Sequence, residues 1–109
     1  IASINSFLKN NPKNSIAVLG DMLELGSYEK EGHVKIIKLI ESSPFEEIFF
    51  VGKLFFKFSK ESNSFKKTMH FFKEKIEAYS YLKKRKFKNK NILIKGSRKL
   101  QLEDTISFF

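Results

Sequence analysis

Aspartate is the rarer of the two acidic residue types in this sequence, and one aspartate follows the first apolar run. Asp21 comes directly after Ser15–Leu19 and Gly20, and Asp104 is the only other aspartate. In that position a carboxylate could bind a ribose hydroxyl, an amine or a metal-bound water. Alternatively, Asp21 only caps the Gly20 turn through the backbone, as aspartate often does in turns. The sequence leaves both interpretations open.

A small group of basic and polar residues follows the last apolar run, Asn91–Lys95. Lys95 and Arg98 supply positive charge. Ser97 adds a hydroxyl group, and Gly96 lets a ligand approach the backbone closely. Because arginine can bind a carboxylate or phosphate through two parallel hydrogen bonds, the group suits an anionic ligand. The alternative is that Gly96 only forms a turn and Arg98 is solvated. Neither G-x-x-x-x-G-K-[ST] nor G-x-G-x-x-G occurs, so the usual glycine-rich phosphate motifs are excluded.

The two histidines offer less to catalysis. His33 lies on the apolar side of a predicted helix, where a hydrogen-bonded packing role is commoner than catalysis. His70 lies in a predicted strand and has no obvious partner. With two histidines, no cysteine and two aspartates, we expect no metal site. The spacing also supports no Ser-His-Asp or Cys-His catalytic set.

The chain is strongly basic, with 21 lysines and arginines against 12 acidic residues and a formal net charge of +9. Basic side chains gather at Lys83–Lys90, where RNA or another acidic partner could bind. We favour a solvated lysine surface, because phosphate recognition tends to favour arginine and only Arg85 and Arg98 are present. No apolar run approaches the roughly 18 residues of a membrane span.

Alternating helix and strand signals predict one α/β domain. Short apolar runs bounded by turn residues are typical of parallel strands that are buried on both faces. Such runs predict strands at Ser15–Leu19, Glu47–Val51, Thr68–Phe72 and Asn91–Lys95. Helical spacing predicts helices near Ile1–Leu8, after Ser27, at Leu54–Phe58, at about Lys73–Lys86 with Ile76, Tyr79 and Leu82 inward, and at Leu102–Phe109.

This alternation predicts a three-layer, Rossmann-like α/β domain with a mostly parallel sheet. Because the chain opens with a helix, we expect a fragment whose first strand is missing. Ligands of such sheets bind beyond the carboxyl ends of the strands. Four loops qualify by this rule: Gly20–Gly26, Gly52-Lys53, the stretch after Phe72, and Gly96–Lys99.

The two polar loops resemble signature segments of the Mur ligase family. Ile16–Gly26 (I-A-V-L-G-D-M-L-E-L-G), followed by His33, resembles one of them, and Ile92–Arg98 (I-L-I-K-G-S-R) resembles the other. Ile48–Gly52, His70-Phe71 and Leu102–Asp104 agree in the same order. The resemblance covers essentially all 109 residues. It is to the C-terminal domain of the members that add D-alanyl-D-alanine to UDP-N-acetylmuramoyl-tripeptide.

The resemblance implies an ATP-dependent amide ligase of cytoplasmic peptidoglycan precursor synthesis, with residues 1–109 as the C-terminal of three domains. It implies that ATP and Mg²⁺ are held mainly by the other domains. There the substrate carboxylate becomes an acyl phosphate that the incoming amine attacks. The family's Y-N-A-N-P segment, which precedes the first helix, is not in this sequence. We therefore expect no ligase activity from the 109 residues alone.

The resemblance also implies roles for individual residues. It places four residues beside the incoming D-alanyl-D-alanine: Lys95, Gly96, Ser97 and Arg98. There Lys95 and Arg98 could offset the free carboxylate of the dipeptide. It places four others on the cleft or nucleotide side of the first loop: Asp21, Met22, Glu24 and His33. No catalytic residue, metal ligand or specific nucleic-acid partner is expected for this chain.

Overall fold

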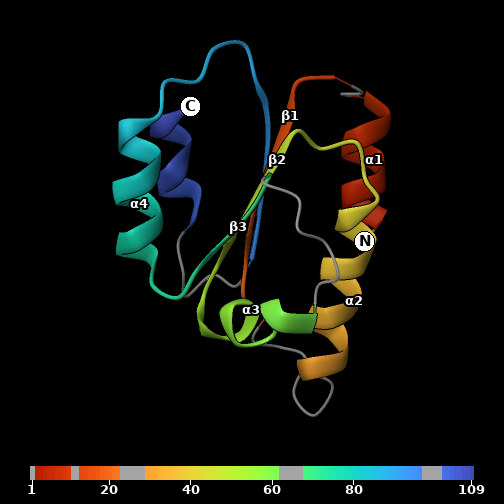
Figure 1. The fold of residues 1–109 in the computed structure, drawn as a ribbon. Coiled ribbons are helices and arrows are strands. Elements are labelled where there is room, and N and C mark those ends of the chain that lie inside the picture. Colours follow the sequence, from red (N-terminus) through yellow and green to blue (C-terminus); the bar gives the residue numbers. More distant parts are fainter. Residues whose placement is uncertain (1, 11–12, 23–28, 62–67, 97–101) are drawn as a thin grey trace.

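The computed structural model describes residues 2–10, 13–22, 29–61, 68–96 and 102–109 (Figure 1). The elements in chain order are α1 (Ala2–Asn10), β1 (Ser15–Gly20), α2 (Glu29–Glu41), β2 (Glu47–Val51), α3 (Lys53–Lys57), the 3-10 turn η2 (Ser59–Glu61), β3 (Met69–Phe72), α4 (Lys75–Lys84), β4 (Asn91–Lys95) and the 3-10 helix η4 (Leu102–Phe108). All four predicted strands are present, and their ends differ from the prediction by at most one residue.

The strands form one parallel sheet in the order β3-β2-β1-β4. Helices α1 and α2 cover one face of the sheet, and α4 and η4 cover the other (Figure 1). The predicted three-layer, Rossmann-like architecture is therefore confirmed. The strand expected before Ile1 concerns residues outside this chain and stays an expectation.

The central strand β1 is buried on both faces, which explains its unbroken apolar run. Ala17 and Leu19 belong to the core on the side of α2, where they join Ile37. Ile16 and Val18 belong to the core on the side of α4. Successive residues of a strand point to opposite faces, so a strand covered on both sides needs apolar residues at every position.

Helix α4 buries Leu82 as predicted, but Ala78 is buried where Ile76 was expected. Ala78 and Leu82, which are one turn apart, are fully buried against the sheet, and Tyr79 is half-buried. Ile76 is 71% exposed, so the prediction that it points inward is wrong. Ile76 precedes Ala78 by two residues, and residues two apart lie on nearly opposite sides of an α-helix.

The last helix also differs from the prediction, because it is a 3-10 helix and not an α-helix. Leu102 and Thr105 are both buried, and Phe108 is half-buried. This spacing of three residues matches the three residues per turn of a 3-10 helix. The hydroxyl of Thr105 donates to the carbonyl oxygen of Leu102 at 2.6 Å, so this buried polar group is satisfied.

A charged cluster ties α4 to the amino edge of the sheet. The guanidinium of Arg85, just after α4, donates two hydrogen bonds to the Glu47 carboxylate, at 2.6 and 3.0 Å, and one to the Tyr81 hydroxyl at 2.9 Å. His70 of β3 lies 2.9 Å from the same carboxylate. His70 therefore has a partner that sequence spacing did not reveal. The cluster joins β2, the edge strand β3 and the end of α4.

The Glu47 carboxylate is held in its ionised form. Partial burial by itself would raise the pKa of Glu47, but the hydrogen bonds from Arg85 and His70 outweigh it and bring the pKa below the ordinary value of 4.5. A carboxylate whose pKa is lowered on folding stabilises the folded state above its unfolded pKa. That contribution is lost as the pH falls through the folded pKa.

We predict that Glu47→Gln lowers the free energy of unfolding near neutral pH by about 1–3 kcal/mol, because it removes a charge that Arg85 binds through two hydrogen bonds. The stability of the variant should also depend less on pH below about pH 5, since no ionised carboxylate is left there to protonate. Urea unfolding over a series of pH values measures both effects.

Glu46→Gln is the matched control. Glu46 pairs with Lys90 at 2.6 Å, but its side chain is 42% exposed. Exposed pairs contribute only about 0–1 kcal/mol. Equal losses of stability from the two variants would contradict a special role for Glu47.

Candidate functional site

The first and last loops meet at the carboxyl edge of the sheet, because β1 and β4 are neighbours. Leu19 pairs with Lys95 at the ends of these two strands. Just beyond them the backbones of Gly20 and Gly96 touch, and a Cβ atom on Gly96 would lie 2.9 Å from the Cα atom of Gly20. A side chain at position 96 has no room. The fold therefore brings the Asp21 segment and Lys95-Gly96 to one place.

Asp21 is 5% exposed and caps helix α3. Its carboxylate oxygens accept hydrogen bonds from the backbone N–H groups of Leu54, at 2.9 Å, and Phe55, at 3.0 Å. Both amides lie in the first turn of α3, and the residue that precedes this helix, Gly52, has no side chain to cap it. A negative charge also stabilises the positive end of the helix dipole. Asp21 thus has a structural role that neither interpretation of the sequence included.

Gly52 makes room for this carboxylate. A Cβ atom at position 52 would lie 2.3 Å from Cγ of Asp21 and 2.5 Å from each carboxylate oxygen. The φ angle of Gly52 is +129°, which residues with a side chain rarely adopt. The backbone on both sides is also fixed, because Asp21 N–H donates to the Val51 carbonyl and Gly52 N–H to the Phe72 carbonyl. Asp21 and Gly52 form one unit.

His33 is fully buried and binds the first loop. The backbone N–H of Met22 donates to Nε2 of His33 at 3.0 Å. The imidazole packs edge-on against Phe55, with ring centroids 4.6 Å apart, and lies 6.2 Å from the Phe58 ring. The hydrogen-bonded packing role that the sequence favoured is confirmed. His33 also joins α2 to α3, since both phenylalanines lie in or just after α3.

The structure brings five of the predicted site residues to one edge: Asp21, Met22, His33, Lys95 and Gly96. Lys95 is half-buried, and Gly96 is exposed. The other three, Glu24, Ser97 and Arg98, lie outside the described residues. Gly52 belongs to one of the four candidate loops but was not among the predicted site residues. A signal for it was present, since Gly52 follows its strand as Gly96 follows another.

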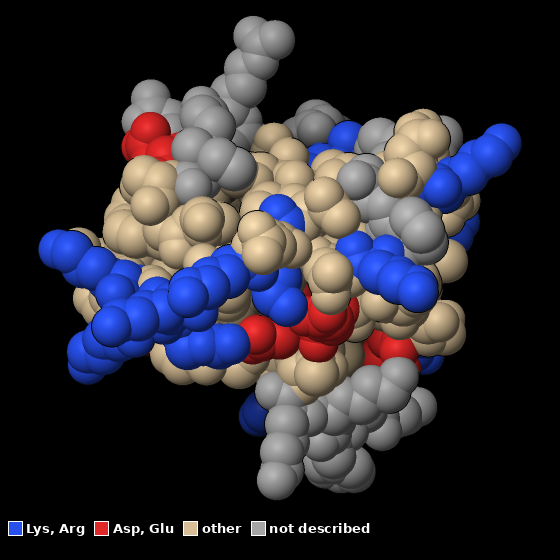
Figure 2. All heavy atoms as spheres, turned by 90° about the horizontal axis from the view of Figure 1, so that it is seen from above, with Lys and Arg blue, Asp and Glu red and all other residues tan. Residues whose placement is uncertain are grey.

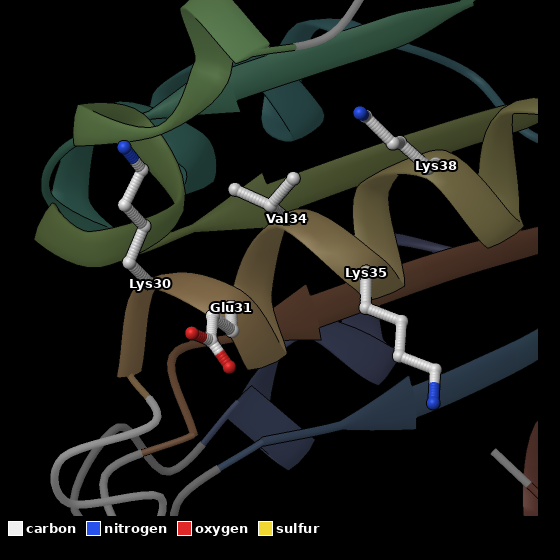
Figure 3. Close-up of a pocket in the computed structure, with 5 residues that line it drawn as sticks. All are labelled: Lys30, Glu31, Val34, Lys35 and Lys38. Carbon is white, nitrogen blue, oxygen red and sulfur yellow. The ribbon is translucent and has the colours of Figure 1, made fainter.

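A shallow cavity of about 420 Å³ lies elsewhere, over helix α2. Its described lining is Lys30, Glu31, Val34, Lys35 and Lys38 (Figure 3). In Figure 3 the amines of Lys30 and Lys38 lie on one side of the helix, and the charged ends of Glu31 and Lys35 lie on the other. Because these groups do not converge, we assign no binding site to this cavity.

Two further features bear on the class of site. Among the described residues, no group of three or more His, Asp or Glu side chains is placed to hold a metal ion. No helix in the same part of the chain combines the length and the apolar character that crossing a membrane requires.

The basic segment Lys83–Lys90 lies at the opposite, amino edge of the sheet. Figure 2 looks onto this edge and shows blue side chains gathered beside a smaller group of red ones. Arg85 binds Glu47, and Lys90 binds Glu46. The remaining lysines at positions 83, 84, 86 and 88 are exposed. Part of this charge therefore serves the fold, and the comparisons below lend no support to an RNA-binding module.

Comparisons with known proteins agree with the Mur ligase resemblance. No family model matches the chain. The UDP-N-acetylmuramoyl-tripeptide–D-alanyl-D-alanine ligase of Buchnera aphidicola is 35% identical over 102 residues, which are 91% of this chain and 21% of the relative. Two crystal structures of MurF from Acinetobacter baumannii share the fold, with TM-scores of 0.77 and 0.76 and sequence identities of 21% and 19%.

Both likenesses cover 97% of this chain, but only 25% and 24% of the two MurF chains. The chain thus spans between a fifth and a quarter of the length of the proteins that it matches. The resemblance to one part of a Mur ligase is therefore confirmed, in sequence by the Buchnera relative and in fold by the MurF structures.

We predict that Asp21→Ala lowers the free energy of unfolding by about 2 kcal/mol, because the amides of Leu54 and Phe55 lose their charged acceptor. Asp21→Asn should cost less, since its amide oxygen can still accept one of the two bonds. Urea unfolding of the three proteins measures the difference.

The only other aspartate provides the control. Asp104 is exposed, so Asp104→Ala should change the free energy of unfolding by less than about 0.5 kcal/mol. If Asp21→Ala is as harmless as Asp104→Ala, Asp21 does not cap α3 in solution.

Proposed function

We propose that residues 1–109 are the C-terminal domain of a larger, three-domain ligase that uses ATP to join D-alanyl-D-alanine to UDP-N-acetylmuramoyl-tripeptide in peptidoglycan precursor synthesis. The name of the Buchnera relative supplies the two substrates that are joined, and 91% of the chain aligns with that protein. The use of ATP and the three domains are what the family resemblance implies. The share of the relative that is matched, 21%, is the size of a single domain and not of the whole enzyme.

One observation carries the proposal furthest. The two segments on which the family resemblance rests are distant in sequence, yet they meet at the carboxyl edge of the sheet through the close contact of Gly20 and Gly96. This edge is where open α/β sheets bind their ligands. The two segments that carry the family resemblance therefore lie together at the edge where a ligand would bind.

We propose that the last loop receives the dipeptide. Its residues would be Lys95, Gly96, Ser97 and Arg98. Lys95 is half-buried, and the structure gives its amine no ion pair with any described residue. A cation in this state is available to a ligand carboxylate. The exposed Gly96 backbone, which carries no side chain, lets the dipeptide approach beside it.

We propose that the first loop forms the cleft or nucleotide side, through Asp21, Met22, Glu24 and His33. ATP and Mg²⁺ are assigned to the other domains. The described residues hold no cluster of acidic or histidine side chains for a metal ion, and the chain has no glycine-rich phosphate motif. We therefore derive no step of the reaction through ATP or Mg²⁺ on this chain. The substrates, ATP and a UDP-linked precursor, suggest a cytoplasmic enzyme.

The full ligase that contains this chain should form the amide product from ATP, the UDP-linked tripeptide and D-alanyl-D-alanine. The 109 residues alone should form none, because they lack the residues for phosphoryl transfer. Product formation is measured by chromatography of the UDP-linked peptides. Turnover by the isolated chain would overturn its assignment as one domain. A full-length enzyme that makes no product from these three substrates would overturn the proposed reaction.

Arg98→Ala in the full ligase should raise the Michaelis constant for D-alanyl-D-alanine by about tenfold or more, because a charged hydrogen bond to a carboxylate contributes about 1.5–3 kcal/mol. Steady-state kinetics at saturating ATP measure it. The only other arginine is the matched control: Arg85 lies at the amino edge, where it binds Glu47. Arg85→Ala should lower stability and leave this Michaelis constant unchanged. An unchanged constant in Arg98→Ala would remove Arg98 from the dipeptide site.

A further inference from the structure

Two hydrogen-bonded contacts hold the described residues at the base of the first loop. The loop leaves β1 at Gly20, and its next two residues, Asp21 and Met22, are buried. Asp21 binds the amides at the start of α3. Met22 binds His33, which lies in the second turn of α2. Because α2 begins at Glu29, the bond between Met22 and His33 ties together the two ends of the intervening segment.

The position of His33 is incompatible with direct contact to a ligand in this conformation. The side chain is 0% exposed, and its Nε2 atom already accepts the Met22 N–H group. An imidazole nitrogen that accepts a hydrogen bond carries no proton, so it cannot donate one to a substrate at the same time. The rings of Phe55 and Phe58 also pack against the imidazole, in an edge contact and a tilted contact.

We propose that His33 is a positioning residue of the ligase, which acts on the reaction by holding the Met22 backbone at the start of the first loop. This inference rests on the proposed function, and it changes the role of His33 from a group that faces the cleft to one that sets where the loop starts. Asp21 holds the same loop from the side of α3. Without His33, the described base of the loop keeps the contact of Asp21 with α3 and loses that of Met22.

Two variants separate the positioning role from a catalytic one. In His33→Gln, the side-chain oxygen of glutamine can take the place of Nε2 and accept the Met22 N–H group, but glutamine cannot act as an acid or base near neutral pH. In His33→Leu, the apolar packing against Phe55 is largely kept and the acceptor is lost. Ile40→Val, a change in the last turn of α2 in the same core, controls for a general loss of stability.

The first measurement is amide hydrogen exchange of Met22 in the 109-residue chain. His33→Leu should speed the exchange of this amide by about tenfold relative to the Leu19 amide in β1, as expected for the loss of one hydrogen bond. His33→Gln and Ile40→Val should leave the ratio of the two rates near that of the unchanged chain. Equal protection of Met22 in His33→Leu would overturn the anchor.

The second measurement is steady-state kinetics of the full ligase over a range of pH. His33→Leu should raise the Michaelis constant for ATP by about three- to tenfold with a smaller change in kcat, because a displaced loop weakens binding. His33→Gln should restore the constant and keep the shape of the pH profile. The loss of one limb of the profile in His33→Gln, or a fall in kcat of about a hundredfold, would show a catalytic role and overturn the proposal.

The two measurements distinguish a failure of the proposed function from a failure of the positioning role. If the unchanged full-length enzyme joins none of the proposed substrates, the proposed function is wrong, while the exchange of the Met22 amide still decides whether His33 anchors the loop. If the enzyme is active but the Michaelis constant is the same in His33→Leu, the positioning role is wrong and the function stands.

Discussion

The carboxyl edge of this domain depends on one buried carboxylate. Asp21 leaves the central strand and caps a helix that starts after the next strand, and its charge meets two amides that would otherwise have no partner. A buried carboxylate is costly unless hydrogen bonds satisfy it, and a buried helix start is costly unless its amides are satisfied. The carboxylate accepts the hydrogen bonds that the amides need, and the amides satisfy the buried charge. The geometry in turn requires glycine at position 52, because any side chain there would collide with the carboxylate.

The contact of Asp21 with α3 also determines where the neighbouring side chains lie. With Asp21 fixed to α3, Met22 is held within reach of His33, and the imidazole packs on the phenylalanines that α3 brings into the core. On the other side of β1, the close contact of Gly20 and Gly96 places Lys95 and the start of the last loop beside the first. Helices α2 and α3 and strands β1 and β4 thus all contribute to one edge, which is where the proposed ligase would receive its substrates.

The opposite edge shows how charge is divided in this basic domain. Glu47 binds both Arg85, just after α4, and His70 of the edge strand β3, and Glu46 binds Lys90, just before β4. The basic segment that invites a nucleic-acid interpretation is in part a set of structural ion pairs. One arginine of the chain belongs to this edge, and we assign the other, Arg98, to the substrate edge. The net charge of +9 therefore has no single functional meaning.

The sequence by itself determined the alternation of strands and helices, because short apolar runs bounded by turn residues favour buried strands and are too short for most helices. It also determined, through its glycines and charged residues, which loops are candidates for chemistry. The inward position of Ile76 and the type of the last helix were mispredicted, since Ile76 and the Leu102 segment fit an α-helical period that packing did not select, whereas Leu82 is buried as predicted. Only the tertiary structure decided the partners of Asp21, His33 and His70. The hydrogen bond from Phe55 to Asp21 spans 34 residues, that from Met22 to His33 spans 11, and that between His70 and Glu47 spans 23. Local spacing carries no information about contacts that the pairing of strands creates.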